Sequence, residues 1–290
     1  MTTPKVNTIK RGGSRYYVEP ESGRKHPGVT SVLNMLPKEF LKFWSAKVVA
    51  EYAVDNLSEL VGIAMKDRGA AVDLLKGAPN RFTRGAADVG TEAHDLFEAI
   101  AKGDRPRRVH NDLKPYVDNF LEFIDECDPE FIFLEETVWS DDHGFAGSFD
   151  ALGVLHGDGA GHLKGKTIFF DWKTTRSGVH EEVALQLSAY SRASHVIRPD
   201  GSRVPLPETD GAAVLLVRPE GWQLVPVETG EVDLGGGQAV DVFDYFLALR
   251  EVFDWDGVVK KRVLGTPVAA GGEFKGKRTT RITRPKAAAK

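Results

Sequence analysis

The sequence predicts an α/β (α+β) fold, with a central mixed β-sheet flanked by helices, a helical elaboration before it and a basic, flexible tail after it. Three observations lead to this prediction. Apolar side chains recur at helical spacing over most of residues 1–128, and short apolar runs bounded by turn residues follow from residue 131. Helical segments also interrupt and close the second half, which is typical of a mixed sheet. The chain of 290 residues, 41% of them apolar, can bury a large core.

The N-terminal elements are expected to be one hairpin followed by helices. Tyr16–Val18 and the turn residues Glu21–Gly23 predict a hairpin, after which Thr30 or Ser31 caps a short helix. Gly77–Asn80, which contains a proline, is expected to separate two helices. Helices are predicted over residues 40–57, 59–77, 84–102 and 112–126.

The C-terminal elements are expected to form the sheet. Strands are predicted over residues 131–139, 146–155, 166–172, 212–217 and 222–227. The second and third strands form one predicted hairpin, and the last two form another. Helices are predicted over residues 180–197 and 239–253.

The net charge of −4 is distributed unevenly. Residues 257–290 contain ten Lys or Arg residues and the single acid Glu273, so this tail carries +9 and the rest of the chain carries −13. An acidic body with a basic tail indicates a polyanionic partner, because the tail adds attraction that is independent of sequence. A solvated, disordered terminus is the alternative interpretation of the same composition.

Cysteine content and hydropathy exclude several classes of protein. The single cysteine, Cys127, excludes a disulfide framework, a cysteine-rich zinc site and a four-cysteine iron–sulfur cluster. No apolar run is long enough to span a membrane, and residues 1–13 lack the apolar segment of a secretory signal. We therefore expect a cytoplasmic protein with no membrane partner.

Charged residues in the predicted central strands indicate metal chemistry. Asp171 and Lys173 are two residues apart in a strand, so their side chains project from the same face. Symmetric pairing of strands 146–155 and 166–172 places Asp150 opposite Asp171. Because two such carboxylates repel each other, we expect a cation between them, and oxygen ligands favour Mg²⁺ with Mn²⁺ as a substitute. An exposed ion pair is the alternative for Asp171 and Lys173.

Two predicted helices carry the remaining candidates. Gly90 lies one turn before His94 on the same helix face, so a second backbone could approach closely there. Gln186 and Tyr190 are four residues apart and also share a face. Each pair alone more often has a structural role than a functional one.

However, the order GxxxH, GxxD, DxK and QxxxY over residues 84–196 resembles the RecB-like branch of the PD-(D/E)XK nuclease superfamily. More loosely, the Tyr-rich hairpin and the helices after it resemble the leading part of phage-encoded nucleases of this branch.

The resemblance implies a Mg²⁺-dependent deoxyribonuclease with a restriction-endonuclease-like core. The implied units are a hairpin and helical elaboration at 1–80, the nuclease core at 81–256 and the basic tail at 257–290. The implied metal ligands are His94, Asp150, Asp171 and the backbone carbonyl of Trp172. Lys173 would activate the attacking water and steady the phosphate. The implied DNA-contacting or supporting residues are Gln186, Tyr190, Gly90, Thr174 and one acid of the pair Glu135 and Glu136, of which Glu136 is taken into the predicted site.

Phage relatives of this kind commonly act as exonucleases that resect DNA ends in recombination, often beside a single-strand annealing protein. DNA and such a protein are therefore the implied partners, and no iron–sulfur cofactor is expected. An endonuclease of the same fold and a non-catalytic DNA-binding recombination accessory protein are the alternatives.

Residues 160–167 also fit a relaxed phosphate-loop pattern, but a strand follows them where that motif needs a helix. Cleavage polarity, strand preference and oligomeric state are left open by these residues.

Overall fold

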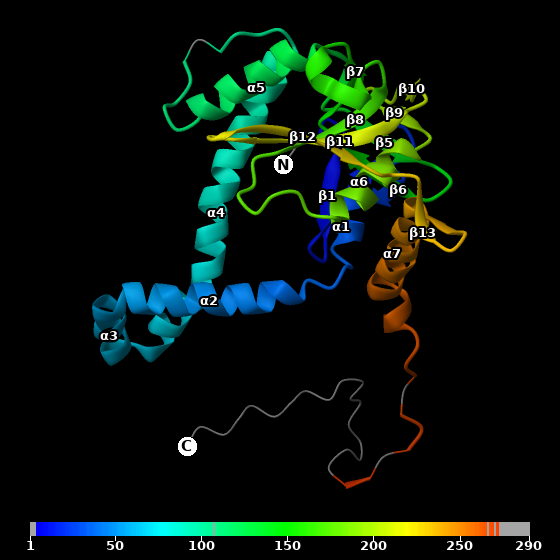
Figure 1. Cartoon of the computed structure of the whole chain (residues 1–290). Coiled ribbons are helices and arrows are strands. Elements are labelled where there is room, and N and C mark those ends of the chain that lie inside the picture. The colour runs from blue at the N-terminus through cyan, green and yellow to red at the C-terminus, as the bar shows by residue number, and fades with distance from the viewer. Residues whose placement is uncertain (1–3, 107, 266, 270, 273–290) are drawn as a thin grey trace.

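The computed structural model describes residues 4–106, 108–265, 267–269 and 271–272, with the backbone alone at 85–88. It confirms a mixed α/β structure in which helices cover a mixed five-stranded sheet (Figure 1). The helices are α1 Val29–Leu33, α2 Glu39–Asp55, α3 Leu57–Lys66, α4 Arg68–Ala101, α5 Lys114–Cys127, α6 Glu182–Ser191 and α7 Val242–Gly257, with the 3₁₀ helices η1 Asp158–Leu163 and η2 Val259–Lys261. The strands are β1 Thr8–Arg11, β2 Ser14–Val18, β3 Lys25–Pro27, β4 Pro129–Leu134, β5 Thr137–Ser140, β6 Phe145–Ser148, β7 Ala151–Leu155, β8 Thr167–Lys173, β9 His195–Ile197, β10 Arg203–Pro205, β11 Gly211–Arg218, β12 Gly221–Val227, β13 Glu231–Gly235 and β14 Gln238–Asp241.

The larger sheet has the strand order β12-β11-β8-β7-β4. Strands β8 and β11 are parallel, and the other neighbours are antiparallel. The predicted register of the β7–β8 hairpin is confirmed, because Ala151 lies opposite Phe170, one step from Asp150 and Asp171. The predicted hairpin of β11 and β12 is also confirmed.

Two segments predicted as single strands are each divided between two sheets. The prediction of one strand over residues 131–139 is wrong, because β4 belongs to the larger sheet and β5 to a four-stranded sheet of order β10-β9-β5-β6. Residues 146–155 are divided in the same way into β6 and β7. The physical reason is Glu135, whose φ of 54° is a left-handed conformation that ends a strand. The two breaks face each other, since the Glu135 amide donates to the Asp150 carbonyl (2.8 Å).

The long helix α4 corrects the prediction at residues 77–80. It runs without interruption through Pro79, so the predicted separation of two helices is wrong. A proline removes one backbone hydrogen bond, and the Arg81 guanidinium donates to the nearby Leu74 carbonyl (2.8 Å). With α2 and α3, the first half of α4 extends away from the sheet (Figure 1). We call α2, α3 and residues 68–84 the arm.

Three smaller predictions are also corrected. The helix predicted over residues 180–197 ends at Ser191, because residues 195–197 pair with β5 as strand β9. Helix α1 begins after Gly28 without a side-chain cap, and the Ser31 hydroxyl instead accepts a hydrogen bond from the Arg15 amide (2.9 Å). Helix α7 begins at Val242 rather than residue 239, because the preceding residues pair as the hairpin of β13 and β14.

The larger sheet carries a hydrophobic core on each face. On one face α4 and α5 pack against Trp172, whose ring lies 5.4 Å from that of Phe120. On the other face α1, α6 and α7 cover Phe169, and the Phe169 and Tyr190 rings are 6.3 Å apart. Alternate residues of β8 therefore enter opposite cores, as expected for a central strand covered on both sides.

Two further observations concern the predicted location and tail. Among the described residues, no helix combines the length and the apolar character needed to cross a bilayer. Most of the predicted tail lies outside the described residues, and within them Lys260 and Lys261 belong to η2.

Candidate metal centre and its lysine

The four motifs meet where β7 begins and β8 ends, at the junction of the two sheets. Helix α4 supplies Gly90 and His94, the turn after β6 supplies Asp150, β8 supplies Asp171–Lys173, and α6 supplies Gln186 and Tyr190. The position of His94 is determined by its neighbours on α4, because Ala93 and Phe97 are fully buried in the core. The structure thus brings together residues that are about 100 positions apart in the chain.

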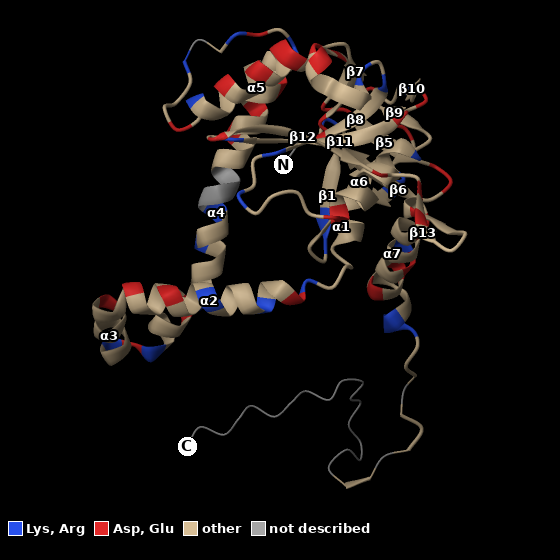
Figure 2. Cartoon of the chain, in the orientation of Figure 1, with Lys and Arg blue, Asp and Glu red and all other residues tan. Residues whose placement is uncertain are grey.

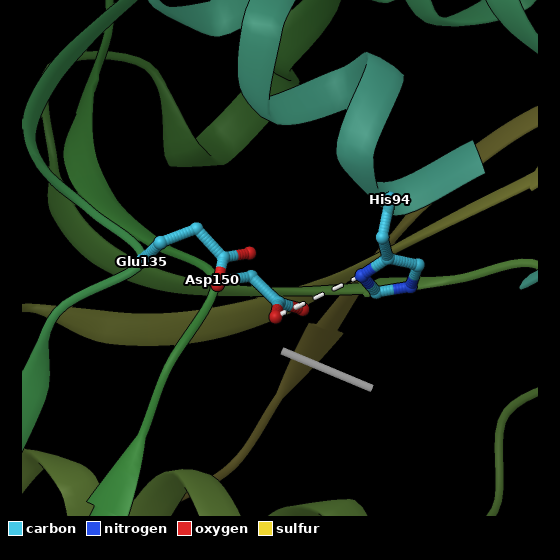
Figure 3. A group of neighbouring side chains, drawn as sticks. All are labelled: His94, Glu135 and Asp150. Carbon is cyan, nitrogen blue, oxygen red and sulfur yellow. Dashed lines mark ion pairs between the residues drawn. The ribbon is translucent and has the colours of Figure 1, made fainter. Parts of the chain in front are cut away.

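His94, Glu135 and Asp150 form a group that could hold a metal ion. Each offers one ligand atom, and these atoms lie within 4.8 Å of one another. Figure 3 shows the His94 ring and both carboxyl groups converging, with 3.9 Å between His94 Nδ1 and Asp150 Oδ1. The left-handed turn at Glu135 aims this carboxyl at Asp150 rather than along the strand. One imidazole and two carboxylates are a donor set that divalent cations accept.

Burial governs the protonation of this group. It raises the pKa of Glu135 to about 9, and the nearby charges of Asp150 and Glu98 add to the rise. Burial also lowers the pKa of His94, although Asp150 opposes the shift. A neutral imidazole is the form that binds metal ions. Among the described residues, the buried His94 Nδ1 atom has no hydrogen-bond partner, which fits a role as a ligand atom.

Asp171 and Lys173 form an ion pair beside the group. Lys173 Nζ lies 2.5 Å from Asp171 Oδ2, and Gln186 Nε2 donates to Asp171 Oδ1 (2.9 Å). Burial raises the pKa of Asp171, and Lys173 opposes this rise. Burial alone would lower the pKa of Lys173, but the carboxylates of Asp171 and Asp150 outweigh it and raise that pKa. The lysine is therefore a cation at neutral pH, and its side chain remains 34% exposed.

The Trp172 amide connects the two parts of the site. It donates to Asp150 Oδ2 (2.6 Å), while the Trp172 ring is completely buried. This hydrogen bond sets the orientation of the Asp150 carboxyl and leaves Oδ1 directed at His94. The predicted role of the Trp172 carbonyl as a ligand stays a prediction.

Tyr190 and Gly147 support the site through close packing. The Tyr190 hydroxyl donates to the Ser148 carbonyl (2.8 Å), two residues before Asp150. A Cβ atom at Gly147 would lie 2.5 Å from Tyr190 Cε1, a distance at which atoms clash. The glycine of the GxxD motif is therefore the residue that admits the tyrosine of the QxxxY motif.

Gly90 and Thr174 are also brought together. A Cβ atom at Gly90 would lie 3.2 Å from Thr174 Oγ1, so the glycine allows the segment after β8 to approach α4.

The two glutamates before Asp150, Glu135 and Glu136, differ in position. Glu136 lies outside the metal-ligand group, and its side chain pairs with Lys5 (3.4 Å). Glu135 is the acid inside the group, and its sequence signal was its place in the acidic pair on the predicted strand before Asp150.

Arg218 is a supporting residue that the sequence motifs do not include. Its guanidinium donates to the Thr175 carbonyl (3.1 Å) and the Arg176 carbonyl (3.0 Å). These bonds hold the loop that follows Lys173 against the end of β11.

The phosphate-loop pattern at residues 160–167 lies in η1 and the start of β8, so it does not open an α-helix.

No protein-family model matches the chain, and no curated protein matches its sequence.

Proposed function

We propose that this chain is a metal-dependent DNA nuclease with a restriction-endonuclease-like core of the RecB-like PD-(D/E)XK type. The observation that carries the proposal is the position of the Asp171–Lys173 pair beside the group of His94, Glu135 and Asp150. Phosphodiester hydrolysis needs a cation near the phosphate and a donor for the developing negative charge. The group of His94, Glu135 and Asp150 could hold the cation, and Lys173 could be the donor.

His94, Glu135 and Asp150 would hold Mg²⁺, or Mn²⁺ in its place. A bound Mg²⁺ would polarise a phosphoryl oxygen and neutralise charge at phosphorus. The resemblance implies Asp171 as a ligand in place of Glu135. The geometry favours Glu135, because Asp171 already accepts from Gln186 and pairs with Lys173.

Lys173 would act as a donor rather than as a base. The raised pKa keeps its ammonium protonated at neutral pH. It can therefore donate to a phosphate oxygen or orient the attacking water as the new O–P bond forms and the bond to the leaving oxygen breaks. Asp171 holds the lysine in place, and Gln186 in turn orients Asp171.

A cleavage assay tests this proposal. Purified protein should degrade DNA with Mg²⁺ or Mn²⁺ and stop when chelator is added. Asp150→Asn and Lys173→Ala should each lower the rate by at least about 100-fold, the scale for loss of a transition-state donor. Lys164→Ala, which removes an exposed lysine of the η1 loop, should leave the rate unchanged. Wild-type rates for the Lys173→Ala protein would refute the assigned role of the lysine.

We further propose an exonuclease that acts on DNA ends, with a single-strand annealing protein as a partner. End-labelled linear DNA should be degraded, whereas a closed circle of the same sequence should survive. Cleavage of both substrates would favour an endonuclease of the same fold. DNA binding without cleavage under either cation would favour the recombination accessory protein instead.

A further inference from the structure

Three exposed phenylalanines lie on α2 and α4, within four residues of the ring contact between Trp44 and Phe82. The exposed fractions are 58% for Phe40, 77% for Phe43 and 64% for Phe82. Phe82 meets α2 through Trp44, with 5.9 Å between the ring centroids, and Trp44 follows Phe40 by one helical turn. We call Phe40, Phe43 and Phe82 the phenylalanine patch. Several large aromatic side chains this exposed in one part of the chain indicate a binding site.

Helix α2 carries apolar residues on all sides, between charged ones, and it packs mainly against α4. Its apolar residues follow one another around the helix, and Val48 alone among them is buried. A helix with apolar residues on all sides normally buries more of them against other segments. In Figure 1, α2 lies in the arm, away from the sheet and its cores. A ligand that covers these apolar side chains would remove them from water.

The charge around the patch favours a polyanion. Within two residues of the three phenylalanines, the chain carries the cations Lys38, Lys42, Arg81 and Arg84, and one acid, Glu39. Glu39 pairs with Lys42 (2.7 Å), and Arg81 packs over Tyr52 at 4.9 Å. The local balance is positive on a body that otherwise carries excess acid, and Figure 2 shows blue segments where α2 and α4 cross. Aromatic rings bordered by cations are the arrangement that binds single-stranded nucleic acid.

Helix α4 connects the patch to the candidate metal centre. Phe82 and Val89, which is 38% exposed, are seven residues apart and lie on the same helix face. Gly90 follows Val89 directly, and His94 lies one turn further along the helix. At about 1.5 Å per residue, Phe82 and His94 are separated by roughly 18 Å along the helix axis. A strand held at the patch is thus within a few nucleotides of the site.

We propose that the phenylalanine patch is a binding subsite on which bases of single-stranded DNA stack. The strand would follow α4 from the arm to Lys173 and the metal-ligand group. The role of this strand as substrate rests on the proposed nuclease function, whereas its binding does not. A second copy of the chain is less favoured as the occupant, because two such positive surfaces would repel each other.

Binding measurements without catalysis test the subsite. The probe is a fluorescein-labelled oligothymidylate, followed by fluorescence anisotropy with the full chain in EDTA. Phe43→Ala combined with Phe82→Ala should weaken binding about tenfold or more, since each stacked base contributes on that scale. Phe43→Trp should retain the affinity. Met65→Ala should not change it, because Met65 is an equally exposed apolar residue at the far end of the arm.

Further readouts separate the possible results. Hydrolysis of bis(p-nitrophenyl) phosphate by the double variant should match wild type, because that small substrate does not reach the arm. Unchanged oligothymidylate affinity in the double variant would overturn the subsite, and so would an equal loss of affinity for a blunt duplex. A change of molar mass in light scattering would identify an interface between copies and overturn it as well. Another result is that wild-type protein hydrolyses neither DNA nor bis(p-nitrophenyl) phosphate while its oligothymidylate binding still depends on the phenylalanines. In that case the nuclease proposal fails and the subsite stands.

Discussion

At the scale of the residue, the site is defined by side chains whose burial opposes their charge. Glu135 is the clearest case, because burial and Asp150 raise its pKa to about 9 from an ordinary value of 4.5. The folded, cation-free protein therefore keeps a proton on Glu135 that the unfolded chain releases between these two pH values. Stability that is present below pH 4.5 should then be lost as pH rises towards 9.

Glu135→Gln should remove this pH dependence. Each pKa unit corresponds to about 1.4 kcal/mol, so the difference is measurable by urea unfolding in EDTA at several pH values. The variant should be more stable than wild type near pH 8 and should gain less stability from added Mg²⁺. Glu136→Gln is the matched control, since Glu136 lies outside the group. If Glu136→Gln flattened the profile and Glu135→Gln did not, the two acids would be assigned the wrong way round.

Cys127 gives a second prediction at this scale. Its thiol is completely buried, and burial raises its pKa to about 11. The thiolate is the reactive form, so the native protein should not react with Ellman's reagent at pH 8, and the protein in urea should react fully. Rapid reaction of the native protein would show that the core around α5 opens readily.

At the scale of the element, the glycine of the GxxD motif couples β6 to α6. Gly147→Ala should destabilise the fold by about 1–3 kcal/mol, because the new methyl group would overlap the buried Tyr190 ring. The midpoint of chemical unfolding measures this cost. Gly62→Ala is the control, since the position in α3 is helical and open. A neutral Gly147→Ala variant would mean that Tyr190 can leave the Ser148 carbonyl without loss.

The elements that could be predicted are those with local signals. The β7–β8 register followed from the symmetry of one hairpin, and so did the approach of Asp150 to Asp171. The division at Glu135 could not be read from a run of apolar residues, because it depends on a left-handed φ stabilised by a hydrogen bond to residue 150. Pro79 misled for the opposite reason, since a local helix breaker was overridden by a long helix packed against α2. The motifs predicted which residues come close together, whereas the position of Glu135 rather than Glu136 in the group was visible only in the folded structure.

At the scale of the whole molecule, charge is separated between an acidic body and a basic tail. The body carries −13 and residues 257–290 carry +9. A body with that charge would repel DNA at long range. The tail and the cations of the arm are therefore the parts that we expect to attract DNA.

Deletion of residues 270–290 should weaken DNA binding and flatten its salt dependence. The deletion removes seven Lys or Arg residues, and the logarithm of the affinity falls with the logarithm of salt concentration in proportion to the phosphates neutralised. A tail of equal length with glutamine at those seven positions should behave like the deletion. Unchanged affinity and slope in both variants would assign the tail to a solvated terminus without a role in binding.

The facing breaks at Glu135 and Asp150 have a mechanical consequence. Each break is the point where a strand passes from one sheet to the other, and the two are joined by the hydrogen bond from the Glu135 amide to the Asp150 carbonyl. We therefore expect the spacing of the two carboxyl groups to depend on how the two sheets meet. A distant substitution that changes the angle between the sheets would alter cation affinity before it unfolds the protein. A rotation of one sheet against the other would then change the spacing of the proposed ligands.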